Sequence, residues 1–253
     1  MKRMTVFGLA ILTATSLLGA ESSPSDVITN ATAKLAQQAS YSWKTTTKFG
    51  NFTGTSEGKI QKDGLVGLTL TFGNNSTGNN STEAFLKDSK GAVKVGDEEW
   101  QSLAELAEAA GDEPGPRLFL LRRLQSFKAP APEAADLAGK TKELKKDGEA
   151  YAGEFTEAGA KELLAVGGRR GSNAPEPKNA KGSVKFWVKD GLLAKLELKL
   201  QGIINFNGED RDVNRTTTVE IKDVGTTKVN VPEAASKKLS AAGPEPAKEG
   251  SKS

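Results

Sequence analysis

The chain has 253 residues and a formal net charge of +3, and it contains neither cysteine nor histidine. By itself it therefore cannot form a disulfide, a Ser-His-Asp or Cys-His catalytic site, or a zinc site built from those side chains. Its basic and acidic residues are interspersed, which does not predict nucleic-acid binding. We expect no metal, no cofactor and no enzymatic activity.

The N-terminus predicts a secretory signal peptide over residues 1–20. Lys2 and Arg3 precede an apolar stretch that ends at Leu18, and small residues up to Ala20 offer a cleavage site. The stretch is shorter than the roughly 20 residues that a membrane span needs. A buried N-terminal helix is the alternative. Because no cysteine is available to carry acyl chains, we expect a periplasmic or secreted bacterial protein that is not lipid-anchored.

The next segment predicts a helix followed by strands. Ser23 and Asp26 mark a helix start, and the apolar spacing continues to about Ala39. Residues 41–49 then alternate with period two and predict a strand. The turn at residues 62–64, Lys-Asp-Gly, predicts a hairpin whose returning strand has Leu68, Leu70 and Phe72 on one face.

Strands and helices are both expected in the middle of the chain. Residues 73–82 form a polar loop with Asn-X-Ser/Thr triplets, which we interpret as a hairpin tip rather than as glycosylation sites. Two strands with a turn near residues 88–91 follow, and Asp97 is expected to cap a helix that ends at Gly111. Further helices are predicted over residues 117–127, from Pro132 to about residue 139, and from a cap at Thr156 to about residue 164. A hairpin turns at residues 146–148.

The last third predicts long strands. Residues 167–182 are a loop by composition, residues 183–202 form a hairpin that turns at Lys189-Asp190-Gly191, and a final strand follows. Residues 241–253 are expected to be a disordered tail. We predict an α+β fold, with one curved antiparallel sheet packed on helices in a single domain over residues 21–240.

The order of these elements is similar to the periplasmic LolA and LppX/LprG-like family of lipoprotein and lipid carriers. The segments that carry this likeness are YSWKTTT at residue 41, VKFWVKDGLLAKLEL at residue 184 and the close of the last strand at Val231-Pro232. The resemblance implies an unclosed half-barrel around helices, with acyl chains held between them. Unlike the LppX/LprG-like members, this chain has no cysteine for an anchor, so the resemblance implies the fold and the ligand class but no residue roles.

The inward-facing apolar residues are the candidates for lining a ligand cleft, because ligand sites are mostly apolar. An ordinary packed core is the alternative for each of them. The candidates are Trp43, Leu68, Leu70, Phe72, Phe85, Phe119, Phe186, Leu196 and Leu198.

Charged groups offer weaker signals. The arginine pairs at residues 122–123 and 169–170 could bind a phosphate or carboxylate, or could simply be solvated. The acidic segment at residues 209–212 lacks the spacing of a calcium loop.

We therefore predict a carrier or binder of a lipid or a lipidated protein, a monomer that makes transient membrane contact. A non-catalytic structural module of the envelope with a filled core is the alternative.

Overall fold

The computed structural model describes residues 22–71, 81–111, 115–165, 176–206 and 208–240. The predicted signal peptide and C-terminal tail, Phe72 and the arginine pair at residues 169–170 lie outside the described residues, as does most of the polar loop predicted at residues 73–82. Within the described residues, no helix has the length and apolar composition needed to cross a membrane.

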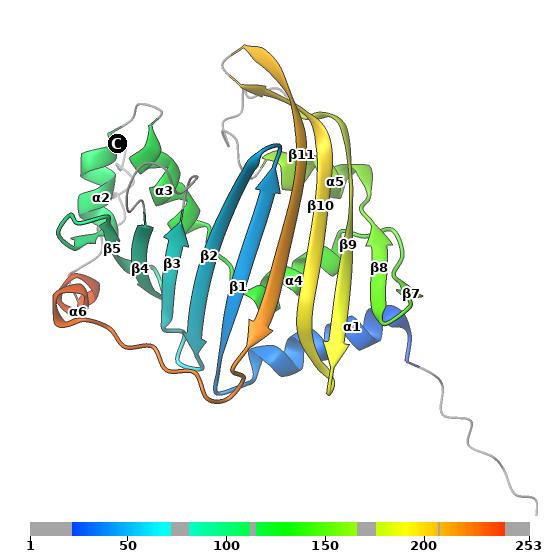
Figure 1. Ribbon diagram of the computed structural model, residues 1–253, viewed down its shortest axis with the longest axis horizontal. Coiled ribbons are helices and arrows are strands. Elements are labelled where there is room, and N and C mark those ends of the chain that lie inside the picture. The colour runs from blue at the N-terminus through cyan, green and yellow to red at the C-terminus, as the bar shows by residue number, and fades with distance from the viewer. Residues whose placement is uncertain (1–21, 72–80, 112–114, 166–175, 207, 241–253) are drawn as a thin grey trace, which may run out of the picture.

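Eleven strands of the described residues form one antiparallel sheet (Figure 1). Six of them run consecutively from the centre of the sheet to one edge: β1 (Ser40–Phe49), β2 (Phe52–Gln61), β3 (Val66–Thr71), β4 (Ser81–Lys87), β5 (Lys90–Val95) and β6 (Gln101–Ser102). The other five run in reverse order to the opposite edge: β11 (Glu209–Lys222), β10 (Leu192–Phe206), β9 (Lys178–Lys189), β8 (Ala150–Glu154) and β7 (Lys145–Asp147). The pairing of β1 with β11 joins the two halves, and the sheet does not close.

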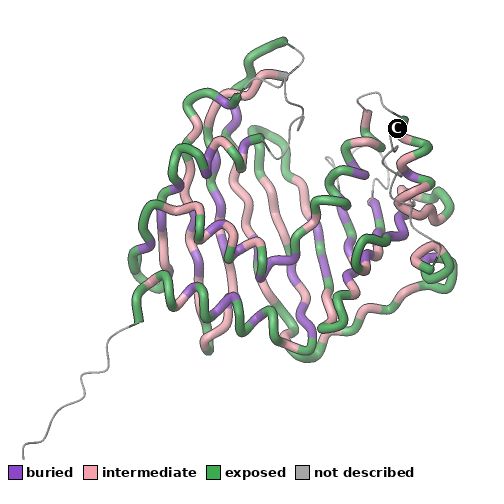
Figure 2. The backbone as a smooth tube through the Cα atoms, turned by 180° about the vertical axis from the view of Figure 1, so that it is seen from behind, coloured by how far each residue is buried: buried purple, intermediate pink, exposed green. Residues whose placement is uncertain are grey.

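Five helices pack against the inner face of this sheet and a sixth against its outer face. The inner five are α1 (Pro24–Ala36), α2 (Leu103–Ala110), α3 (Pro116–Gln125), α4 (Pro130–Gly139) and α5 (Glu157–Ala165). Figure 2, seen from the helix side, shows buried strand residues between and beneath them. The sixth helix, α6 (Glu233–Ser240), packs on β4 and β5 after a segment that runs along the sheet. The predicted α+β class and the curved, unclosed half-barrel are confirmed.

Local sequence signals explain most of these boundaries. The Ser23 hydroxyl accepts a hydrogen bond from the Asp26 amide at 3.1 Å, and Pro24 occupies the first turn of α1, as predicted. Thr156 caps α5 in the same manner, accepting from the Gly159 amide at 3.0 Å. Gly64 and Gly148 have positive φ values, which the turns of their hairpins require.

Four boundary predictions were wrong. The last strand, β11, ends at Lys222 rather than at Val231-Pro232. Helix α2 begins after Ser102 rather than Asp97, because Ser102 and Glu105 form a reciprocal capping box. Residues 178–182, predicted as loop, belong to β9, because they pair with β10 despite their polar composition. Helix α1 ends at Ala36, short of the predicted Ala39.

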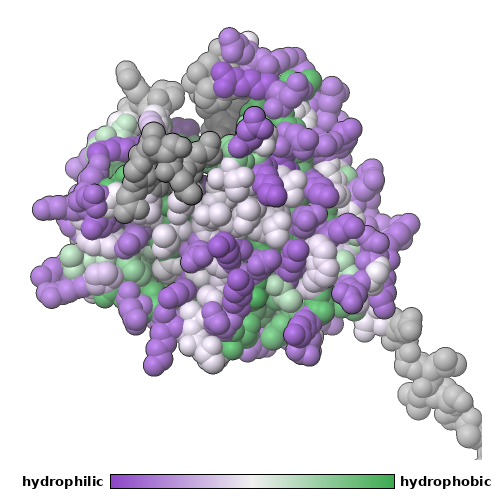
Figure 3. Space-filling view, in the orientation of Figure 1, coloured by the Kyte–Doolittle hydropathy of each residue, from purple (hydrophilic) through white to green (hydrophobic). Residues whose placement is uncertain are grey.

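The two faces of the sheet differ in chemistry. Strand alternation places Trp43, Leu196 and Phe186 on the inner face, where they are at most 5% exposed. On the outer face, Thr46, Thr55 and Thr218 occupy one cross-strand row. Figure 3 shows this outer face with pale residues of intermediate hydropathy over the middle strands; the residues around them are mostly hydrophilic, with some hydrophobic residues lower on the face. The apolar surface of the sheet is therefore directed toward the helices.

Candidate functional site

The lower half of the inner face is a filled core. Tyr41 and Trp43 pack with centroids 5.8 Å apart, and the Trp43 ring stacks on Phe127 at 6.1 Å with an interplanar angle of 18°. Phe186, Leu193 and Leu196 are at most 1% exposed. Here the helices cover the sheet fully, so these side chains form ordinary core contacts.

The inner face is less completely covered over the upper ends of β1 and β2. Moving up β1 from Trp43, the inner positions become Thr45 and Thr47, both half-buried, and then Phe49, which is 43% exposed. On β11 the side chain opposite Thr47 is Thr217, and the two hydroxyls lie 3.3 Å apart. The change from aromatic core to hydroxyl groups and exposed aromatic rings marks an open end of the concave face.

A cross-strand row forms the rim of this open end. Phe49 lies opposite Phe52 on β2 and opposite Arg215 on β11, so all three are on the inner face. Phe52 is 39% exposed. We call Phe52, Phe49 and Arg215 the rim row. It combines two accessible apolar rings with one cation.

Helix α3 and the residues after it carry a similar combination of two aromatic rings and one arginine. Phe119, Arg123 and Phe127 follow one another at intervals of four residues and therefore lie along one side of the chain. The stacking of Phe127 on Trp43 fixes this side toward the sheet. Phe119, two turns away, is 52% exposed. The stripe therefore changes from buried to accessible as it leaves the core, just as β1 does.

Arg215 is an unusual cation for the inner face of a sheet. It is half-buried, and its Nη2 atom donates a long hydrogen bond of 3.5 Å to the Leu163 carbonyl of α5. Its Nε atom is buried and has no hydrogen-bond partner among the described residues. Desolvation lowers the pKa of the guanidinium. Buried donors without acceptors are rare in folded proteins, so this side chain requires an explanation.

Two other charged groups act on Arg215: Glu133 raises the pKa of its guanidinium, and Arg123 lowers it. Desolvation raises the pKa of the Glu133 carboxyl on α4, while Lys128, Arg215 and Arg123 act in the opposite direction. Arg123 is exposed to water, yet desolvation lowers its pKa.

The predicted lining residues fall into three groups. Trp43, Leu68, Leu70, Phe186, Leu196 and Leu198 lie on the inner face and are at most 6% exposed, so they form its floor and core. Phe119, on α3, is 52% exposed, and Phe72 is outside the described residues. Whether any of these residues contacts a ligand stays a prediction.

The expectation that Phe85 points inward was wrong. Phe85 pairs with Gly67 on the outer face, and its ring packs on Trp100 with centroids 5.5 Å apart. A Cβ at Gly67 would lie 3.2 Å from the Phe85 ring and 3.3 Å from Val229, in the segment that leads to α6. The segment before α6 covers this part of the outer surface. An aromatic side chain can therefore point outward here without being fully exposed to water.

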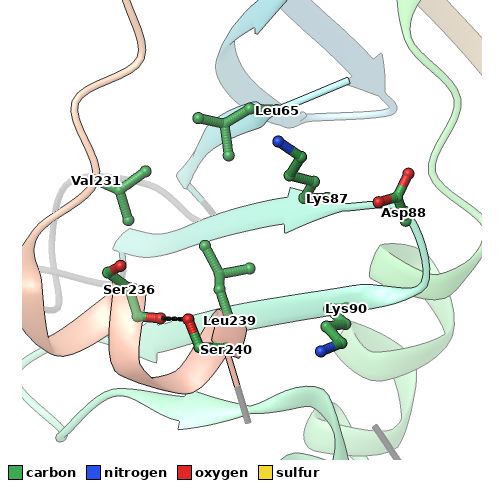
Figure 4. A pocket seen from close by; sticks show the side chains of 8 residues that line it. All are labelled: Leu65, Lys87, Asp88, Lys90, Val231, Ser236, Leu239 and Ser240. Carbon is green, nitrogen blue, oxygen red and sulfur yellow. Dashed lines mark hydrogen bonds between the residues drawn. The ribbon is translucent and has the colours of Figure 1, made fainter. Parts of the chain in front are cut away.

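Two hollows in the described part of the chain lie away from the open end. One, of about 380 Å³, lies between α6 and the outer face of β4 and β5 (Figure 4). It is lined by both apolar and charged side chains: Leu65, Lys87, Asp88, Lys90, Val231, Ser236, Leu239 and Ser240. The other, of about 440 Å³, is polar and lies near Ser42 and Asp223. Neither hollow is lined by residues of the rim row.

The acidic segment at residues 209–212 is engaged in surface ion pairs. Asp210 accepts from Lys178 at 2.8 Å, and Glu209 from Arg211 at 3.5 Å. Across the residues that the structure describes, no group of three or more acidic side chains is arranged to hold a metal ion.

Sequence reasoning missed Phe49, Phe52, Glu133 and Arg215. The sequence does contain a signal for Arg215. In the alternation of β11 it falls on the inward face, the same face as Val213 and Val219. An arginine at a position of apolar alternation is an anomaly that a strand pattern can reveal. Nothing in the sequence around Glu133, at the start of a helix, distinguishes it from a residue that complements the helix dipole.

No protein-family model matches the chain, and no curated protein matches it. Among solved structures, the fold is similar to LprF from Mycobacterium bovis, with a TM-score of 0.43, 12% identity and coverage of 84% of this chain and 97% of that one. It is also similar to a chain in the Pseudomonas aeruginosa MucA/MucB complex, with a TM-score of 0.39, 13% identity and coverage of 87% and 61%. At these TM-scores the function has to be argued from the residues of this chain.

Proposed function

We propose that this protein binds the acyl chain of a lipid or of a lipidated protein at the open end of its concave face. The proposal rests on three large aromatic side chains that are exposed to solvent. Phe49, Phe52 and Phe119 each have between 39% and 52% of their surface exposed. They are the only large hydrophobic residues of the described chain that are exposed, and two of them lie in the rim row. Phe49 and Phe52 lie opposite each other, and adjacent exposed apolar groups mark binding sites more often than scattered ones do.

The energetics are sufficient for such binding. Each CH₂ group removed from water contributes roughly 0.8 kcal/mol, so partial burial of one long chain could offset the entropy lost on association. The filled lower core limits the site to the upper half of the inner face. A ligand there would extend over Thr45, Thr47 and Thr217 toward the rim row.

Export to the bacterial envelope is part of this proposal. The N-terminal pattern of residues 1–20 supports export. A carrier of acyl chains would work in the aqueous space between two membranes. We propose no catalysis. Transient contact with a membrane would load or unload the ligand, and the exposed rings are suited to that contact.

A probe-uptake experiment tests the proposal. Protein stripped of lipid by denaturation and refolding is titrated with an environment-sensitive fluorescent fatty acid, and saturable uptake is expected. Replacing Phe49 and Phe52 together by serine should weaken uptake about tenfold or more, because both rings would be lost as contact surface. These residues are better probes than Leu70 or Leu198, whose burial makes a polar replacement destabilise the fold.

Trp187→Ser is the matched control, because Trp187 is a half-buried aromatic residue on the outer face, where the Lys195 ammonium lies 4.7 Å from its ring. It should leave uptake unchanged. A folded protein that takes up no probe would refute the proposal.

The second candidate is a non-catalytic interaction module with a filled core. The near-complete burial of Phe186, Leu193 and Leu196 favours it. In that case the exposed rings would contact a protein surface. The native protein would then co-purify with a polypeptide and with no lipid, which intact-complex mass spectrometry distinguishes.

A further inference from the structure

A polar hollow of about 440 Å³ lies at the lower end of the outer face, away from the rim row. Strands β1 and β2 contribute Ser42 and Lys59 to it, and the other lining residues belong to the segment that follows β11 and leads to α6 (Figure 1). Its volume falls within the roughly 300–1,000 Å³ of small-molecule sites. Because every side chain of its lining is polar, a ligand that fits it must be polar as well.

Hydrogen bonds hold the wall of this hollow against the sheet. The Ser42 hydroxyl donates to the Asp223 carboxylate at 2.7 Å, and the Thr227 hydroxyl donates to the Asp223 carbonyl at 2.8 Å. Farther along the segment, the Val229 amide donates to the Gln61 side chain at 2.9 Å. The segment is thus fixed to both β1 and β2. A ligand would therefore meet polar groups that are already in position, which lowers the entropy cost of binding.

Two lysines line the hollow from different elements. Lys59 is on β2, and Lys228 is in the segment after β11. Neither ammonium group has an ion pair or a hydrogen bond within the described part of the chain, and neither does the side-chain amide of Asn230. Asp223 is the one acidic residue of the lining. Two lysines and one aspartate leave the hollow with a net charge of +1.

Charged residues at neighbouring positions of the sheet do not remove this excess. Lys44 pairs with Glu57 at 3.5 Å, and Lys222 pairs with Glu220 at 3.8 Å, so both acidic groups already have a cation. A phosphate or carboxylate group is electrostatically complementary to the two lysines of the hollow. The Asp223 carboxylate, in turn, has acceptor sites left for the hydroxyl groups of a ligand.

We propose that this hollow binds a small anionic sugar, a hexose that carries a phosphate or carboxylate group. The anionic group contacts the ammonium groups of Lys59 and Lys228, while the sugar hydroxyls bond to Asp223 and Asn230. Because the lysines are exposed, the affinity is modest and falls as the ionic strength rises. The site lies on the outer face, so it does not depend on the acyl binding proposed above.

Four ligands separate the contributions of charge and sugar: glucose 6-phosphate, glucuronate, glucose and inorganic phosphate. Binding is measured on the ¹⁵N-labelled full chain at low ionic strength, through the amide chemical shifts of residues 223–230. We expect both anionic sugars to bind about fivefold or more tightly than glucose, and glucose 6-phosphate to bind more tightly than inorganic phosphate. The ratio between the two anionic sugars shows which anion the site prefers.

Lys59→Met and Lys228→Met each remove one ammonium group and keep an aliphatic side chain. Each should weaken the binding of glucose 6-phosphate about threefold or more and reduce its advantage over glucose. Lys62→Met is the matched control, because Lys62 is exposed in the adjacent hairpin turn and does not line the hollow. It should leave binding unchanged. Uptake of the fluorescent fatty acid should be the same in all three variants.

The outcomes separate this site from the acyl site. If none of the four ligands shifts the amides of residues 223–230, the sugar site is refuted. Equal binding of glucose and glucose 6-phosphate would overturn the role of the lysines. Equal binding of inorganic phosphate and glucose 6-phosphate would overturn the sugar as ligand. None of these results would affect the acyl proposal, because the hollow and the rim row share no residue.

Discussion

Gly58 on β2 lies directly beneath the indole ring of Trp43 on β1. A Cβ atom built at Gly58 would be 2.0 Å from Trp43 Cζ2, closer than any real contact. The two residues are paired in the β1–β2 register, and Trp43 is 5% exposed. The absence of a side chain at residue 58 is therefore what lets the indole lie flat on the sheet and stack on Phe127.

Gly58→Ala should consequently destabilise the protein by about 1–3 kcal/mol, the usual cost of overpacking a tight core. Urea unfolding followed by circular dichroism measures this. Gly54→Ala on the same face of the same strand is the control. Its Cβ would meet Phe52 at 3.1 Å, and that exposed ring can move away. Equal stability of the two variants would contradict the packing described for Trp43.

The filled and open halves of the concave face should respond differently to truncation. Leu196 is 1% exposed, so Leu196→Ala should cost about 2–5 kcal/mol through lost burial and cavity formation. Phe119 is 52% exposed, so Phe119→Ala should change the unfolding free energy by less than about 1 kcal/mol. Thermal or urea unfolding of both variants measures the difference. A large loss in Phe119→Ala would mean that this ring belongs to the core.

Alternation and turn chemistry predicted most of the sheet. The Lys-Asp-Gly turns at residues 62, 146 and 189 lie in hairpins, and residues 41–49 are a strand whose inner face carries Trp43. These signals are local, since each depends on φ/ψ preferences or on side-chain parity within one strand. The helix caps at Ser23 and Thr156 are local in the same sense.

The candidate site could be predicted only in part, because its residues come together through long-range pairing. Phe49 and Arg215 are adjacent only because β1 pairs with β11, which joins opposite ends of the chain. Phe85 was assigned to the inner face because no local signal shows that the segment before α6 covers the outer one. The cap of α2 is Ser102 rather than Asp97, because Ser102 and Glu105 together form a capping box.

Burial of Tyr41 predicts a loss of stability at alkaline pH. Desolvation raises the pKa of its hydroxyl from 10.0 to about 12, opposed by a backbone hydrogen bond with Ala131. Because the folded pKa is above the unfolded one, the stabilisation is fully present below pH 10 and is lost as the pH rises toward 12. At about 1.4 kcal/mol per pH unit, the loss reaches roughly 2 kcal/mol.

Tyr41→Phe cannot ionise and should lack this loss, so the comparison is of urea midpoints at about pH 9 and about pH 11.5 for both proteins. Tyr151→Phe replaces the other tyrosine of the chain, at a half-buried position of β8, and serves as the control. It should show the same alkaline loss as the wild type. The same alkaline loss in the wild type and in Tyr41→Phe would show that Tyr41 is not its source.

Glu105 connects α2 to α6 and should make this contact sensitive to acid. Its carboxylate accepts from the Lys238 ammonium at 2.6 Å and from the Ser102 amide at 2.7 Å. These bonds, the lysine first, lower the pKa of Glu105 from 4.5 to about 2. Because the folded pKa is below the unfolded one, the stabilisation is present above pH 4.5 and is lost as the pH falls toward 2.

Glu105→Gln should therefore reduce the unfolding free energy at neutral pH by about 1 kcal/mol or less, since the pair is partly exposed and screened by solvent. The difference from wild type should shrink as the pH falls to about 2 and also in high salt. Amide hydrogen exchange in α6 should become faster in the variant at neutral pH, because the lysine of α6 loses its charged partner. Glu108→Gln, at an exposed position of α2, should show none of these changes. If exchange in α6 were the same in both variants, the ion pair would not be what holds α6 against α2.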